Sequence, residues 1–197
     1  MTKHYRTVAK ERKTSETQVR LSLALDGGSC SIDTGVGFFD HMLMLLAHHS
    51  RIGLTLDASG DTHVDDHHTV EDVGIVLGQA LSDVLGDKKG IERFGFASIP
   101  MDEALVRVSV DLSGRSSLVY DVKFACGSDK IGTFDTQLVR EFLTALVNNG
   151  CFNCHVELVS GRNNHHIAEA IFKALGRSLH QAVAITGLDL PSTKGVL

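Results

Sequence analysis

Two stretches of this 197-residue chain repeat each other in register. The segment HHTVEDVGIVLGQAL at residues 67–81 aligns without a gap with HHIAEAIFKALGRSL at residues 165–179, at an offset of 98 residues. Each copy carries two adjacent histidines, a glutamate four residues after the first of them, and the same Leu-Gly pair further on. A duplication of this kind predicts two halves of similar plan that pack on each other. We place the first half at residues 1–95 and the second at residues 96–197, together forming one compact unit.

Hydrophobic periodicity predicts both strands and helices. Alternation with a period of two indicates strands at 19–25, 54–58, 105–112, 118–124 and 155–159, and helical spacing indicates helices at 38–49, 67–85, 135–149 and 165–185. Because strands and helices do not alternate strictly, an α+β fold is favoured over a doubly wound parallel sheet. Apolar residues of the two repeated helices should face the core, namely Val70, Val73, Leu77, Leu81, Ile171, Leu175 and Leu179.

The repeated histidines and glutamates have the spacing of metal ligands. On a helix that begins at residue 67, His67 and Glu71 lie on one face, whereas His68 points elsewhere. The second copy divides in the same way into His165 with Glu169 and, separately, His166. Adjacent histidines are often ordinary surface residues, but their duplication in register favours a two-metal site. Imidazole and carboxylate ligands together suit manganese, iron or zinc better than magnesium or calcium.

The residues around the two histidine pairs support this interpretation. The helix that precedes each copy has a candidate ligand near its start, His41 in one half and Glu141 in the other. Polar residues just before each pair are expected to cap the helix, namely Asp65, Asp66, Asn163 and Asn164. Asp66 or Asp72 could also orient a ligand imidazole.

Composition excludes several classes of function. A net charge of −5 and a pI near 6.1 argue against a nucleic-acid or membrane-surface partner. No apolar run is long enough to cross a bilayer, and the first residues lack the apolar core of a signal peptide. The cysteines include a single CxxC, which is too little for a zinc ribbon, so buried thiols in a reducing cytoplasm are the favoured interpretation; they are Cys30, Cys126, Cys151 and Cys154.

Three cations lie beside glycines, where the backbone allows an anion to approach closely. They are Arg93 in GIERFG, Arg115 in DLSGR and Lys194 in PSTKG, and each is a candidate phosphate ligand. Neither GxxxxGK[ST] nor GxGxxG is present, so the use of ATP or a dinucleotide is unsupported.

These features together resemble the imidazoleglycerol-phosphate dehydratase family of histidine biosynthesis over essentially the whole chain. The stretches that carry the resemblance are RKTSETQV, GFFDHMLMLLAHH, GDTHVDDHHTVEDVGI, KGIERFG, DEALVRVSVDLSGR, GTFDTQLVREF, GRNNHHIAEAIFKALGRSLHQAV and PSTKGVL. The resemblance implies a duplicated α+β fold, in which each half is a four-stranded sheet with two packed helices, as in ribosomal protein S5 domain 2. It also implies a cytoplasmic homo-oligomer of 24 subunits, with active sites between subunits and two Mn²⁺ ions per site.

The resemblance also implies roles for individual residues. One ion would be held by His41, His68, His165 and Glu169, and the other by His67, Glu71, Glu141 and His166. Glu16 and His49 would be catalytic, Glu16 as the acid/base, and the substrate would contact Glu16, His41, His49, Arg93, Arg115, Ser192, Thr193 and Lys194. The implied reaction removes water from an imidazole-glycerol phosphate through a metal-bound imidazolate and a diazafulvene-like intermediate.

This chain departs from the family pattern at three positions. Glu141 stands where many members carry histidine, Leu45 where some have glutamine, and Ser116 where proline is common. The first change is expected to shift metal preference, the second removes a polar contact with substrate, and the third is expected to loosen a turn. Two other functions use the same metal ligands. A binuclear metallohydrolase would leave Glu16 incidental, and a metal-storage or structural shell would give Arg93, Arg115 and Lys194 no role.

Overall fold

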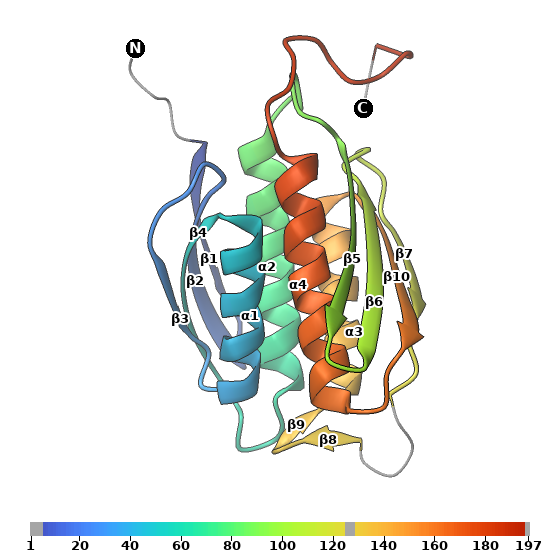
Figure 1. Ribbon diagram of the computed structural model, residues 1–197. Coiled ribbons are helices and arrows are strands. Elements are labelled where there is room, and N and C mark those ends of the chain that lie inside the picture. The colour runs from blue at the N-terminus through green and yellow to red at the C-terminus, as the bar shows by residue number, and fades with distance from the viewer. Residues whose placement is uncertain (1–5, 125–128, 196–197) are drawn as a thin grey trace.

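The structure is a computed structural model that describes residues 6–124 and 129–195. Figure 1 shows two sheets on the outside of the molecule and four helices between them. The first half contains β1 (Thr7–Lys13), β2 (Thr17–Ala24), β3 (Cys30–Asp33), α1 (Gly37–Ser50), β4 (Gly53–Gly60) and α2 (His67–Leu85). The second contains β5 (Phe94–Met101), β6 (Ala104–Asp111), β7 (Ser117–Asp121), α3 (Gln137–Gly150), β10 (Asn153–Ser160) and α4 (Asn164–Ala182). A small pair, β8 (Lys130–Ile131) and β9 (Phe134–Asp135), precedes α3.

The two sheets have the same topology. Their strand orders are β1-β2-β4-β3 and β5-β6-β10-β7, and in each the last pair is parallel while the other two pairs are antiparallel. In β2 and β6 every second residue is buried against the helices, as the period of a strand requires. The predicted α+β fold with an internal duplication is therefore confirmed.

Most predicted elements are present, with some differences in extent. All four helices were predicted, although α4 ends at Ala182 and not at residue 185. The strand predicted at 118–124 ends at Asp121, and the strands β1, β3, β5, β8 and β9 were not predicted. Among the described residues, no helix combines the length and apolar composition needed to cross a membrane.

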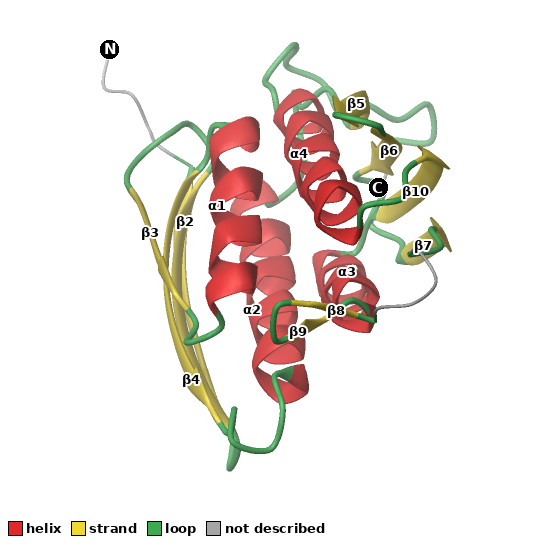
Figure 2. Cartoon of the chain, turned by 60° about the horizontal axis from the view of Figure 1, so that its bottom comes forward, coloured by secondary structure: helices red, strands yellow, loops and turns green. Residues whose placement is uncertain are grey.

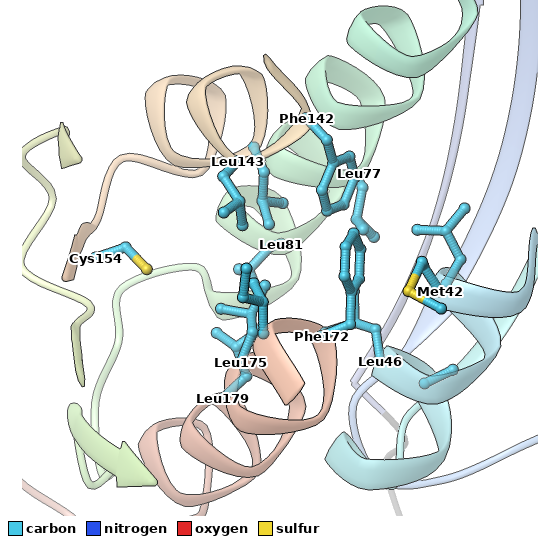
Figure 3. Packing of buried hydrophobic residues seen from close by; sticks show 14 of the residues in the cluster. Met42, Leu46, Leu77, Leu81, Phe142, Leu143, Cys154, Phe172, Leu175 and Leu179 are labelled. Carbon is cyan, nitrogen blue, oxygen red and sulfur yellow. The ribbon is translucent and has the colours of Figure 1, made fainter. Parts of the chain in front are cut away.

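The two halves share one hydrophobic core. Helix α1 packs on α4, and α2 packs on α3, so that each contact joins the halves. Figure 3 shows Met42 and Leu46 of α1 facing Phe172 of α4 across this core. The rings of Phe142 and Phe172 stack with centroids 5.4 Å apart. All the apolar residues predicted to face the core from α2 and α4 are buried.

The glycine repeated in both copies explains how closely the helices approach. A Cβ atom on Gly78 would lie 2.6 Å from the carbonyl oxygen of Leu146 on α3, and one on Gly176 would lie 2.8 Å from that of Leu46 on α1. Each glycine therefore lets the backbones of two helices touch, once in each helix pair.

All four helices begin at the same end of the molecule, the lower end in Figure 1. Helix α2 follows α3 in the same direction, since Gly74 meets Phe142 and Gly78 meets Leu146. Figure 2 brings this end forward and shows β8 and β9 lying beside it. The histidine pairs at the starts of α2 and α4 are consequently at one end of the chain, which we call the histidine end.

Replacing Gly78 by alanine should lower the free energy of unfolding by about 1–3 kcal/mol, because the added methyl group overlaps the α3 backbone. Chemical denaturation followed by circular dichroism measures this change. Gly37→Ala is the matched control, since a Cβ atom there meets nothing within 4 Å. Equal stability of the two variants would contradict the close packing of α2 on α3.

Candidate metal centre and active site

Three predicted metal ligands meet at the histidine end. The Nε2 atoms of His41 on α1 and His165 on α4 each lie 3.0 Å from Oε1 of Glu169, one turn further along α4. The two imidazole rings are 6.2 Å apart between centroids. The parallel packing of α1 on α4 brings these side chains together, although His41 is more than 120 residues from the other two in sequence.

Glu169 is held as a carboxylate. Its side chain is buried, and its second oxygen, Oε2, lies 2.5 Å from Nζ of Lys173. Burial by itself raises the pKa of Glu169, but hydrogen bonds from Lys173, His41 and His165 together lower that pKa to about 2. Glu169 therefore stays ionised at neutral pH, with Oε2 paired to Lys173 and Oε1 facing the two imidazoles.

A second cluster lies at the start of α2. Nδ1 of His68 is 3.1 and 3.2 Å from the two carboxylate oxygens of Asp61 and 3.7 Å from Oε2 of Glu16. The hydrogen bond to Asp61 is the main cause that raises the pKa of His68. The structure thus brings the predicted acid/base Glu16 beside a predicted metal ligand, and adds Asp61, which the sequence did not single out.

The donor atoms of the first cluster fit a divalent transition-metal ion, since its three ligand atoms lie within 4.8 Å of one another. The set of His41, His165 and Glu169 offers two imidazole nitrogens and one carboxylate oxygen, a combination that suits manganese, iron or zinc.

The other predicted ligands do not form a cluster within the described part of one chain. His67 borders a surface hollow with Gln137 and Leu138 of α3, and Glu141 borders a neighbouring hollow. Glu71 is exposed, and Nδ1 of His166 lies 2.7 Å from Oε2 of Glu103. Of the four ligands proposed for the first ion, three meet in one chain and His68 lies apart from them. The four ligands proposed for the second ion do not meet within the described part of one chain.

The predicted helix caps are partly present. Oδ1 of Asn163 accepts hydrogen bonds from the backbone N–H groups of His165 and His166, and Oδ1 of Asp65 accepts one from His67. Asp66 makes no such capping bond. The prediction that Asp72 orients an imidazole is wrong, because its buried carboxylate bonds instead to Arg12 Nε at 2.9 Å and to the hydroxyl of Thr17.

Candidate phosphate ligands lie at the opposite end of the molecule. Arg93 forms a bidentate ion pair with Asp111 and donates from Nη1 to the carbonyl oxygen of Pro191 at 2.8 Å, so it holds the segment that carries Ser192, Thr193 and Lys194. The backbone N–H of Arg93 also bonds to the carbonyl oxygen of Ala182, the last residue of α4. Because His165 is 17 residues earlier on α4, about 26 Å separates this end from the histidine end.

Arg115 lies in the loop between β6 and β7. Asn153 donates from Nδ2 to its carbonyl oxygen at 2.6 Å, and the Ser116 hydroxyl donates to the carbonyl oxygen of Asn148 on α3 at 3.0 Å. Ser116, which the sequence suggested would loosen this turn, instead fastens it to α3. Since Phe94, Asp111, Asn153 and Ser117 form one row across the sheet, Arg115 lies at the same end as Arg93.

His49 lies on α1 two turns after His41 and faces α4, while His48 is exposed. Partial burial is the main cause that lowers the pKa of His49, with smaller contributions from His48 and Lys173. His49 is therefore a neutral imidazole at ordinary pH. The cysteine interpretation holds only in part, since Cys154 is buried but Cys30 is exposed; Cys126 lies outside the described residues.

Fold and site together define a class: a duplicated α+β protein with imidazole–carboxylate clusters at the start of its helices. The model of one family, imidazoleglycerol-phosphate dehydratase, matches residues 34–179. The chain belongs to this family and is accordingly a dehydratase, that is, a carbon–oxygen hydro-lyase.

Individual relatives are similar over nearly their full length. Imidazoleglycerol-phosphate dehydratase of Desulforamulus reducens is 56% identical over 192 residues, which cover 95% of this chain and 96% of the relative. The solved structure of the Staphylococcus aureus enzyme has a TM-score of 0.83 at 44% identity and covers 91% of this chain and 99% of its own. That of the Pyrococcus furiosus enzyme in complex with (S)-C348 has a TM-score of 0.82 at 36% identity and covers 95% and 100%.

Replacing His165 by alanine should weaken Mn²⁺ binding by more than about 10-fold. Loss of a residue that only orients a metal ligand already costs about 10-fold or more in affinity, and loss of the ligand itself should cost at least as much. Titration of metal-free protein with Mn²⁺ by calorimetry measures the affinity. His155→Ala is the matched control, because His155 is exposed on β10, away from the cluster. Unchanged affinity in the His165 variant would rule out this cluster as a metal centre.

Proposed function

We propose that the chain converts D-erythro-imidazole-glycerol phosphate to imidazole-acetol phosphate in the histidine pathway, in the cytoplasm, with two Mn²⁺ ions per active site. The observation that carries the proposal is the convergence of His41, His165 and Glu169, which supplies a nitrogen- and oxygen-lined cation site in a member of this dehydratase family. The carbon that loses its proton has no adjacent carbonyl group, so the enzyme must activate the substrate through its imidazole ring.

Two metal ions held by the histidine and carboxylate ligands proposed below would supply the positive charge that stabilises the substrate's ring as an imidazolate. Loss of hydroxide from the carbon next to the ring would then give a diazafulvene-like species. A proton must then leave the following carbon to form an enol, which becomes the ketone. One water is lost overall, and no electrons are gained or lost. The protein therefore has to hold the ring, move one proton and anchor the phosphate.

Glu16 is the residue we assign to the proton transfer. It lies on the exposed turn between β1 and β2, with a carboxylate oxygen 3.7 Å from the ring of His68. The turn is fixed by Thr14, whose hydroxyl accepts hydrogen bonds from the backbone N–H groups of Glu16 and Thr17. A fixed carboxylate beside the metal ligands can take a proton from substrate bound there, which typically accelerates a reaction about 10²- to 10⁴-fold. His49 would border the substrate as a neutral imidazole.

The phosphate would bind at the other end of a chain, to Arg93, Arg115, Ser192, Thr193 and Lys194. Guanidinium groups and hydroxyls suit phosphate oxygens. Arg93 already pairs with Asp111 and holds the segment from Pro191 onward, so it would position Lys194 as well as attract the anion.

One chain cannot bring both ends to the same substrate. The histidine end and the Arg93 end are about 26 Å apart along α4, whereas the substrate spans less than about 10 Å from ring to phosphate. We therefore propose that active sites form between subunits, as in the 24-subunit shell implied by the family resemblance. Apolar side chains beside Arg93 are exposed in the single chain and would be covered on assembly, namely Phe94, Phe96, Ile185 and Leu188.

The same reasoning assigns the metal ligands across subunits. One ion would take His41, His165 and Glu169 from one chain and His68 from another; the second would take His67, Glu71, Glu141 and His166. Each proposed set then combines side chains that the single chain keeps apart.

Replacing Arg115 by alanine should raise KM strongly while leaving Mn²⁺ binding and assembly intact, because its guanidinium contributes only to phosphate binding. Steady-state kinetics, metal titration and light scattering measure the three quantities. Lys123→Ala, an exposed cation near β7, is the control. A metal-storage shell or an unrelated hydrolase would show no such selective loss, and an unchanged KM would remove Arg115 from the substrate site.

Mixed assemblies of two inactive variants test whether sites are shared. Glu16→Gln should bind substrate but stall turnover, and Arg115→Ala should bind it poorly. If Glu16 and Arg115 of one site come from different chains, coexpressed variants that assemble at random should regain about a quarter of the wild-type sites, since both intact residues then meet by chance. A different tag on each variant allows assemblies that contain both to be isolated. If these are no more active than either variant alone, one chain contributes both residues to a site.

A further inference from the structure

The second histidine of each repeated pair has one ring nitrogen occupied by a carboxylate. Nδ1 of His68 faces both oxygens of Asp61, and Nδ1 of His166 lies 2.7 Å from Oε2 of Glu103. In both cases Nδ1 makes the hydrogen bond to the carboxylate. Nε2 of His166 lies 3.6 Å from an oxygen of the exposed Asp102, which is beyond hydrogen-bond distance. His41 and His165 direct Nε2 toward their cluster, at Glu169.

Glu103 is fixed independently of the histidine. Its other oxygen, Oε1, accepts hydrogen bonds from the backbone N–H groups of Arg162 at 3.2 Å and Asn163 at 2.8 Å. These bonds tie the β5–β6 turn to the loop that starts α4. With Oε1 held by these two N–H groups, Oε2 is directed at the ring and lies 2.7 Å from Nδ1 of His166.

We infer that Asp61 and Glu103 are positioning residues that hold His68 and His166 with Nδ1–H toward the carboxylate, so that Nε2 is the nitrogen that binds manganese. This inference rests on the proposed metal chemistry of the same site. A carboxylate that accepts the Nδ1 proton fixes the tautomer, sets the ring angle and makes Nε2 a stronger donor to a cation. Neither residue is a ligand in the proposed sets.

The two halves reach the same arrangement from different loops, which supports a functional reason for it. Glu103 lies on the turn between the first two strands of its sheet, and the corresponding turn of the first half carries Glu16. Asp61 directly follows β4, and the position that directly follows β10 is Gly161, which has no side chain to offer. Because Asp61 holds His68, Glu16 is left free to act on substrate.

The test measures Mn²⁺ affinity of full-length, metal-free protein from the electron paramagnetic resonance signal of unbound Mn²⁺. In Glu103→Gln, the two backbone N–H groups require the amide oxygen, so the NH₂ group faces Nδ1 and forces the proton onto Nε2. We expect affinity to fall about 10- to 100-fold in this variant and in Asp61→Ala. Glu157 is an exposed carboxylate on β10 that pairs with Arg107 of β6 at 3.4 Å, and Glu157→Gln should bind Mn²⁺ as the wild type does.

A comparison at His68 separates the two carboxylates that face it. Glu16→Gln should keep near-normal Mn²⁺ affinity but lose turnover, whereas Asp61→Ala should lose affinity. Should Glu103→Gln not fold, Asp61→Ala decides, because Asp61 bonds to His68 in a short loop on the surface. If the wild type binds Mn²⁺ and the folded Glu103→Gln and Asp61→Ala variants bind it equally well, this inference is wrong, while the proposed metal chemistry still stands. Wild-type protein that bound no Mn²⁺ would overturn the proposed metal chemistry and this inference with it.

Discussion

The backbone contacts at Gly78 and Gly176 determine which parts of the four helices lie side by side. Each contact joins one half of the chain to the other, and each leaves no room even for a methyl group. Sliding α4 along α1 by one turn would move it about 5.4 Å. That shift is larger than the 3.0 Å between His41 and Glu169, so the candidate metal cluster depends on the register that the glycine contact fixes. Packing in the core and chemistry at the helix ends are thus set by the same constraint.

Helix N-termini are an unusual place for cations, because the helix dipole places partial positive charge there. The chain offsets this with carboxylates, one on α4 itself and two on neighbouring loops. Glu169 is ionised by its contacts with Lys173 and two histidines, and Asp61 and Glu103 add negative charge beside His68 and His166. The field at the histidine end is therefore set by loops as much as by the helices that carry the ligands.

The sequence predicted the helices better than the strands and the loops. Helical spacing in α1 to α4 was clear because each helix buries a wide apolar stripe. Strand β1, with the sequence TVAKERK, was missed because it is an edge strand with no fully buried residue, and β5 combines outward-facing Phe94 and Phe96 with a proline. The candidate metal ligands could be proposed because the duplication repeats them in register. Asp61 and Glu103 could not be, since nothing in a single sequence shows that a loop carboxylate will meet a histidine from another element.

Electrostatics explains why one cluster is formed in a single chain and its counterpart is not. In corresponding places of the two helix pairs, α1 and α4 offer His41, His165 and Glu169, whereas α3 and α2 offer Glu141, His67 and Glu71. Two imidazoles and one carboxylate can contact each other through N–H···O hydrogen bonds without a cation, as observed. Two carboxylates in one site repel each other until a cation lies between them, and Glu71 is exposed in the single chain. We therefore propose that Glu141 makes the second site more dependent on its metal than the first, and that its carboxylate oxygen favours a harder cation such as Mn²⁺ over Zn²⁺.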